Sequence, residues 1–193
     1  KTSASDLAVF RKLLELLQLP PDLAGAVADW IDPDYEVTYP GGAEDMVYLA
    51  LDPAYRAANR ALTTVDGLAR LKGFDAATIE RLRPFVTALP QPTTINLNTA
   101  PAEVLAASIA DLSLEQARAL VNARKGRHFK DISDFRARLP ETVKQVNDAV
   151  LGVASRYFLV SGHARFGRAK VGYAALLERD ATAWPKLVWQ KNI

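Results

Sequence analysis

The hydrophobic period of this chain changes once, near Gly152, and that change limits the possible fold more than any other feature. Before it, apolar residues mostly fall three or four positions apart, as on one helix face; after it, they alternate, as along a strand. The expected strands lie near 156–160, 171–177 and 187–189. Helices followed by strands indicate an α+β fold, because βαβ units would alternate the two. We therefore expect an α-helical domain over 1–152 and antiparallel strands over 153–193.

Two segments of the helical region, 62–89 and 97–125, each have the pattern helix, short turn, helix. Their residues differ too much to define a sequence repeat, so we describe them as two helix-hairpin-helix-like pairs. Two further short helices are expected near 133–138 and 141–150. The side chains suited to cap helix N-termini are Ser5, Thr63 or Thr64, Asp75, Asn98 or Thr99, and Ser113 with Gln116.

The composition excludes several classes of protein. The chain has 193 residues, of which 49% are hydrophobic and 24% charged, as is typical of a soluble globular protein. The lack of cysteine excludes disulfides, thiolate metal sites and cysteine nucleophiles. No apolar stretch approaches the roughly 20 residues of a membrane-spanning helix. Because the chain begins with Lys1 rather than a methionine or a leader peptide, we expect a processed or truncated product.

The most unusual local composition lies in residues 29–52, which we call the acidic loop. It contains no lysine or arginine, in a chain whose formal net charge is +2. Its carboxylates are Asp29, Asp32, Asp34, Glu36, Glu44, Asp45 and Asp52. These like charges repel one another because neighbours on a folded loop lie within the Debye length of about 8 Å. A hard cation such as Ca²⁺, which takes about six to eight oxygen ligands, would relieve the repulsion, so the loop is either a calcium site or a solvated acidic segment.

The chain has none of the common catalytic motifs. It lacks a Gly-x-Ser-x-Gly nucleophile elbow, a phosphate-binding Gly-rich loop with Lys and Ser/Thr, and a His-Glu-x-x-His zinc motif. Its histidines, His128 and His163, have no obvious catalytic partner in the sequence. We therefore predict that the protein is not an enzyme and has no small-molecule substrate.

The second helix pair offers an alternative function as a nucleic-acid-binding module. Residues 95–105 and the basic residues that follow them resemble the helix-hairpin-helix of DNA-uptake and repair proteins. In that family, a glycine-rich turn points backbone N–H groups at a DNA phosphate. The corresponding turn here, 108–113, has no glycine, so we do not expect the positive-φ backbone that holds an anion, and its Asp111 would repel one. We therefore expect nucleic acid not to bind through this turn.

Several short segments, taken in order, resemble one protein family. Among them are Asp29-Trp30-Ile31-Asp32-Pro33-Asp34, Gly42-Ala43-Glu44-Asp45, Pro53-Ala54-Tyr55-Arg56-Ala57-Ala58-Asn59, Leu68-Ala69-Arg70-Leu71-Lys72-Gly73, Ile95-Asn96-Leu97-Asn98-Thr99-Ala100 and Ser155-Arg156-Tyr157-Phe158. By these segments the chain is similar to the protein K family of the bacterial type II secretion system, whose members are large minor pseudopilins. The resemblance runs from about residue 10 to about residue 160.

The resemblance implies a calcium-binding, largely α-helical domain inserted into a pilin-like α/β fold. It also implies an N-terminal membrane helix, expected to precede this chain, and a periplasmic body anchored in the inner membrane of a Gram-negative bacterium. The implied partners are the minor pseudopilins I, J and H at the pseudopilus tip. There the bulky domain is expected to prevent further subunits from adding, and the complex to start assembly for protein export, without catalysis.

Two of the matched segments lie in the acidic loop, so the resemblance favours the calcium interpretation. The ligands that we expect are Asp32, Asp34, Glu44 and Asp45, with Asp52 as a weaker candidate. For partner contacts two alternatives stay open, because apolar residues in the strands either meet other pseudopilins or cover the expected N-terminal helix. These residues lie in 155–160, in 169–178 and at Trp184 and Trp189.

Overall fold

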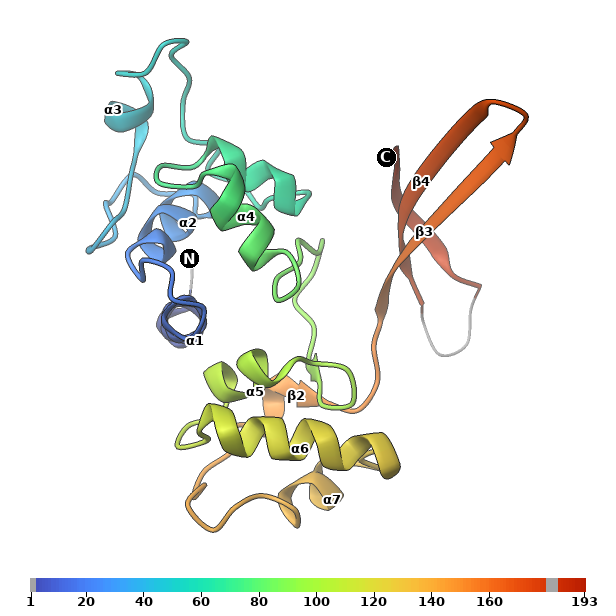
Figure 1. The fold of residues 1–193 in the computed structure, drawn as a ribbon. Helices are drawn as coiled ribbons and strands as arrows, with labels where there is room; N and C mark the ends of the chain where they lie inside the picture. The colour runs from blue at the N-terminus through green and yellow to red at the C-terminus, as the bar shows by residue number, and fades with distance from the viewer. Residues whose placement is uncertain (1–2, 180–183) are drawn as a thin grey trace.

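The computed structural model describes residues 3–179 and 184–193, and it arranges them as helices followed by a sheet (Figure 1). The α-helices are α1 (Ala4–Leu16), α2 (Leu23–Ile31), α3 (Asp45–Tyr48), α4 (Ala76–Leu82), α5 (Ala102–Ser108), α6 (Leu114–Gly126) and α7 (Ile132–Arg136). The 3-10 helices are η1 (Val65–Arg70) and η2 (Asp148–Val150). The strands are β1 (Ile95–Asn96), β2 (Leu151–Gly152), β3 (Tyr157–Phe166), β4 (Ala169–Glu178) and β5 (Lys186–Asn192). The predicted α+β fold class is confirmed.

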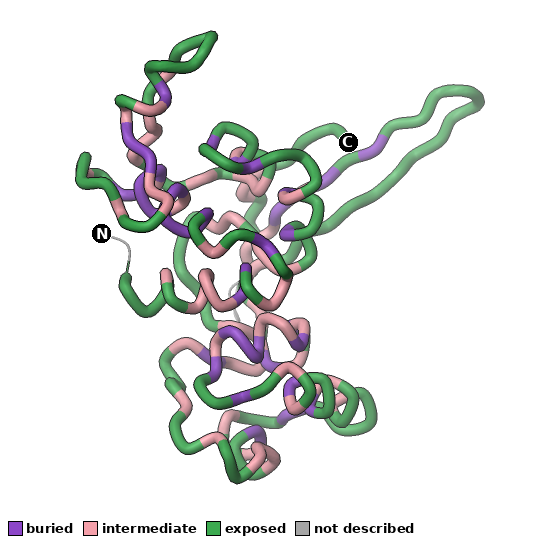
Figure 2. The backbone as a smooth tube through the Cα atoms, turned by 60° about the vertical axis from the view of Figure 1, so that its left-hand side comes forward, coloured by how far each residue is buried: buried purple, intermediate pink, exposed green. Residues whose placement is uncertain are grey.

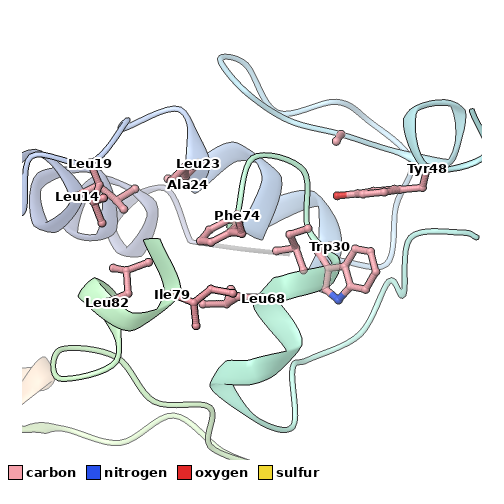
Figure 3. Packing of buried hydrophobic residues seen from close by; sticks show 12 residues of the cluster. Leu14, Leu19, Leu23, Ala24, Trp30, Tyr48, Leu68, Phe74, Ile79 and Leu82 are labelled. Atoms are coloured by element: carbon pink, nitrogen blue, oxygen red, sulfur yellow. The ribbon is translucent and has the colours of Figure 1, made fainter. Parts of the chain in front are cut away.

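The helical region contains two hydrophobic cores, and the first one positions the acidic loop (Figure 3). We call it the first core, and it consists of Leu14, Leu19, Leu23, Ala24, Trp30, Ala43, Tyr48, Leu68, Leu71, Phe74, Ile79 and Leu82. The Trp30 ring lies edge to face with the Tyr48 ring at a centroid distance of 5.2 Å. Such aromatic pairs stabilise beyond their buried area. The end of α2 and the end of α3 are therefore fixed against each other, with most of the acidic loop between them.

The second core joins α5, α6, α7 and β2. It consists of Leu97, Ala100, Ala102, Leu105, Ala106, Ile109, Leu112, Ala117, Leu120, Phe129, Phe135 and Leu151. The predicted capping box of Ser113 and Gln116 is present at the start of α6. Asn98, which starts no helix, donates from Nδ2 to the Phe129 carbonyl at 2.9 Å and accepts from the Phe129 N–H at 2.8 Å. The side chain of Asn98 thus joins the segment before α5 to the backbone that follows α6.

The three predicted C-terminal strands form an antiparallel sheet in the order β3–β4–β5. Cross-strand pairs such as Leu159 with Leu176 place apolar residues on the same face of the sheet. A groove of about 600 Å³ runs along this face, with Leu176 and Trp189 among its lining residues. Beyond the groove, the β3–β4 hairpin extends away from both cores (Figures 1 and 2).

An ion-pair cluster joins the sheet to the first core. Lys191 Nζ of β5 lies 2.6 Å from Asp66 Oδ2 of η1, and Arg83 lies 2.9 Å from Asp66 Oδ1. The hydrogen bonds from these two cations hold the pKa of Asp66 below its usual range. All three side chains are half-exposed, so this cluster orients the sheet more than it adds stability.

Several local expectations are wrong. Ser5 lies inside α1, whose N-cap residue is Ser3, and Pro101 rather than Asn98 or Thr99 occupies the N-cap of α5. Thr64 stands at the N-cap of η1 without a side-chain cap bond, whereas Asp75 does cap α4. Residues 141–150 form no helix except η2. Their regularly spaced valines pack against the second core from an irregular segment, so the spacing alone did not indicate a helix.

The pairing of β1 with β2, which is parallel, was not predicted because each strand has only two residues. The proposed domain boundary at residue 152 stays a prediction. No helix among the described residues is both long and apolar enough to cross a membrane.

Candidate metal centre

The end of α2 buries a carboxylate against the acidic loop. Asp29 is fully buried, and its Oδ1 accepts a hydrogen bond from the Thr38 N–H at 3.0 Å. Its Oδ2 is buried and has no hydrogen-bond partner within the described residues. A buried carboxylate oxygen without a partner costs free energy, because it has lost water and gained nothing in exchange. This oxygen is therefore suited to bind a cation.

Glu44, the N-cap residue of α3, lies in the same situation. Its side chain is 6% exposed, and both carboxylate oxygens are buried without a hydrogen-bond partner in the described part of the chain. Burial, followed by repulsion from Asp29, Asp32, Asp45 and Asp34 in that order, raises the pKa of Glu44 to about 7. Carboxylates from both ends of the loop therefore act on one side chain.

The other predicted ligands differ in burial and in the hydrogen bonds and ion pairs that their carboxylates make. Asp32 is buried directly after α2. Asp34 Oδ1 accepts from the Glu36 N–H at 3.0 Å in a local turn. Asp45 Oδ1 accepts from the Ala57 N–H at 3.0 Å, and its Oδ2 lies 3.6 Å from Arg56 Nη1. Asp52, the weaker candidate, is exposed.

Two residues near this site were not selected from the sequence as ligands. Asp29 lies one turn after the buried residues Gly25 and Ala26, so an acid on the inner face of a helix was the available signal. Asn59 donates from Nδ2 to the Asp34 carbonyl at 3.4 Å, and its buried Oδ1 has no partner among the described residues. No short-range pattern in the sequence connects Asn59 with Asp34.

The chemistry of these groups fits a hard cation, because the available atoms are carboxylate and amide oxygens. Within residues 3–179 and 184–193, however, no three acidic or imidazole side chains converge closely enough to hold a metal ion as they stand. Mutual repulsion of the carboxylates opposes such convergence when no cation offsets it. The structure thus has the donors for a calcium site but not a closed coordination shell.

Gly42 allows the loop to reach Asp29, and we predict that Gly42→Ala is destabilising. A Cβ at position 42 would lie 2.4 Å from both Asp29 Oδ2 and the Thr38 carbonyl oxygen. Because the carbonyl belongs to the backbone, the expected cost is about 1–3 kcal/mol, measured by urea unfolding. Gly126→Ala is the matched control, since a Cβ there meets nothing within 4 Å. Equal stability of the two variants would contradict the close packing of the loop on α2.

The turn of the second helix pair differs from expectation in one respect. Asp111 takes a φ of 59°, so the turn does adopt the left-handed backbone without glycine, which aspartate tolerates better than most residues. The turn nevertheless presents a carboxylate rather than an anion site. Of the nearby cations, Arg124 donates to the Leu97 carbonyl at 2.6 Å and Arg138 pairs with Asp134. These contacts serve the fold, and they do not favour nucleic-acid binding.

The chain is thus an α+β protein in which a helical region, whose acidic loop contains buried carboxylates, precedes an antiparallel sheet. Comparison with known families gives a more specific result. Residues 1–91 and 95–154 match two family models, both described as type II secretion system protein K. The chain belongs to the protein K family of the type II secretion system.

Individual relatives agree with this assignment. The chain is 35% identical over 183 residues to type II secretion system protein K of Pseudomonas aeruginosa. This alignment covers 93% of this chain and 54% of the relative. It is also 35% identical over 183 residues to protein K of Klebsiella pneumoniae, covering 89% of this chain and 56% of the relative. The chain thus spans about half the length of the curated relatives that it matches.

A solved structure resembles the whole chain. It is the crystal structure of the GspK-GspI-GspJ complex from the enterotoxigenic Escherichia coli type 2 secretion system. The match has a TM-score of 0.83 at 26% sequence identity, and it covers 100% of this chain and 72% of the chain that it matches. The order of helices and strands described above is therefore shared with that structure.

Proposed function

We propose that this chain is the periplasmic part of a non-enzymatic minor pseudopilin that assembles with the minor pseudopilins I, J and H at the tip of the pseudopilus. The observation that carries the proposal is the likeness of the entire chain to a protein found in complex with GspI and GspJ. In this function the helical region, with its two cores, is the bulky part that limits further addition of subunits. The complex also helps to start pseudopilus assembly for protein export. The protein is anchored in the inner membrane.

We further propose that the acidic loop binds calcium as a structural ion. Asp32, Asp34, Glu44 and Asp45 are the proposed ligands, and the unpartnered Oδ2 of Asp29 adds a fifth. Calcium prefers such hard oxygen donors and tolerates irregular geometry. The support is the burial of Asp29 and Glu44, because two buried carboxylates with unpartnered oxygens are hard to explain in a purely solvated loop.

Co-elution tests the assembly proposal. The chain is mixed with a purified pair of pseudopilins I and J from the same secretion system and separated by size exclusion, in calcium and in chelator. We expect one peak that contains all three proteins in calcium, and a weaker or absent complex in chelator. Separate elution of a folded chain in both buffers would contradict the proposed partners. If all three proteins eluted as one complex in both calcium and chelator, only the structural role of calcium would be contradicted.

A further inference from the structure

The far end of the β3–β4 hairpin carries only positive charge. We call residues 161–172 the hairpin apex. Between Phe158 and Leu177 the chain has Arg165, Arg168 and Lys170 and no carboxylate. None of the three cations makes an ion pair within the described residues, and Arg165 Nε donates to the Gly167 carbonyl at 3.1 Å. The apex is therefore a local positive surface that the rest of the described chain does not neutralise.

Two of these cations face each other across the hairpin. The strand register places Arg165 of β3 directly opposite Lys170 of β4, on the same face of the sheet. Like charges at directly opposed positions destabilise a strand pair. By contrast, Arg156, directly before β3, lies 2.5 Å from Glu178 of β4. An anion that approaches the apex from outside the described chain would relieve this cost.

The shape of the apex suits a broad, flat surface. Gly167 has a φ of 57° and opens the two-residue turn, which leaves the side chain of Phe166 90% exposed. The groove beside the sheet is lined by Ser161 and Ala174 but by none of the residues from 162 to 172. Both views show the apex well beyond the helical region, so a planar surface can reach it without meeting the two cores (Figures 1 and 2).

We propose that the hairpin apex docks on an anionic phospholipid surface. Arg165, Arg168 and Lys170 meet the headgroup phosphates, and the exposed ring of Phe166 enters the interface between headgroups and acyl chains. Basic residues attract negatively charged leaflets, and exposed aromatic side chains add apolar burial at the same depth. An apex whose residues 161–171 are all exposed suits a broad headgroup layer better than it suits the side-chain pockets of a protein partner.

Vesicle sedimentation tests this proposal on the 193-residue chain. One set of vesicles contains phosphatidylglycerol mixed with phosphatidylcholine, and the other contains phosphatidylcholine alone. Chelator is present throughout, so that calcium cannot bridge the acidic loop to the lipid phosphates. The apex variant is R165Q/R168Q/K170Q. The matched control is K72Q/K125Q/K144Q, which removes the same number of exposed cations from the helical region.

We expect the wild-type chain to bind the anionic vesicles, in a salt-sensitive way, and not the neutral ones. The apex variant should bind roughly a hundredfold more weakly and the control within about threefold of wild type, since each basic residue near such a surface contributes about 1 kcal/mol, or about fivefold. Absence of binding to anionic vesicles overturns the proposal, and so does an equal loss in both variants. An apex variant that binds vesicles normally but no longer co-elutes with pseudopilins I and J also overturns it, and assigns the apex to an acidic protein surface.

Discussion

Replacing Phe135 by alanine is expected to lower the free energy of unfolding by about 3–5 kcal/mol, the cost of removing a buried aromatic ring from a core. Phe135 is fully buried, and its ring lies edge to face with Phe129 at a centroid distance of 5.0 Å. The ring of Phe129 is in turn covered by the guanidinium of Arg138, 5.0 Å from its centroid. The second core therefore loses both the ring and the contacts that order its neighbour.

The measurement is a thermal melt followed by circular dichroism, in which each kcal/mol corresponds to about 2–4 °C for a chain of this size. Phe166→Ala is the control, because the side chain of Phe166 is 90% exposed and its removal should change stability by less than about 0.5 kcal/mol. If Phe135→Ala melted at the same temperature as Phe166→Ala, the second core would not be packed as described.

Glu44→Gln is expected to have opposite effects with and without calcium. The folded state raises the pKa of Glu44 from 4.5 to about 7, so folding favours the protonated form. The stability that comes from this shift is complete below the unfolded pKa and is lost as the pH rises through about 7. Above that pH, in chelator, the wild-type chain holds a buried charge that glutamine does not carry. The variant should therefore melt at a higher temperature than the wild type in chelator.

Calcium reverses the order, because the ion binds the ionised carboxylate. At calcium about a hundredfold above its dissociation constant, binding contributes about 2.7 kcal/mol to the wild-type chain. This gain should shrink as the pH falls below the pKa of Glu44, and it should be much smaller in Glu44→Gln at any pH. Glu36→Gln is the matched control, since Glu36 belongs to the same loop but is exposed. Identical calcium responses of the two variants would remove Glu44 from the site.

The fold was predictable where the signals are local. The change to alternating apolar residues after Gly152 located the sheet, and the pair Ser113 and Gln116 marked the start of α6. The errors occurred where a distant part of the chain decides the local structure. Asn98 has a good capping side chain, but it is engaged by the backbone of Phe129, so Pro101 takes the cap position instead.

The candidate site was predictable in outline for a similar reason. The density of carboxylates located the acidic loop in the sequence. Two of the four residues expected as ligands, Asp32 and Glu44, are buried in the structure. Burial of Asp29 depends on the approach of Gly42 and Thr38, which return to α2 only in the folded loop. Sequence spacing also does not show which carboxylate oxygens have hydrogen-bond or ion-pair partners in the folded chain. It therefore could not distinguish Glu44, whose oxygens have no hydrogen-bond partner in the described residues, from Asp45, whose oxygens contact Ala57 and Arg56.

Isothermal titration of calcium into the chelator-treated chain measures whether the buried carboxylates of the acidic loop bind calcium, as we propose. Above the pKa of Glu44, we expect saturable binding of at least about one ion per chain, lost or strongly weakened in the double variant Asp29→Asn/Glu44→Gln. Glu36→Gln should bind as the wild type does. A folded wild-type chain that binds no calcium under these conditions, or a double variant that binds it equally well, would contradict the claim.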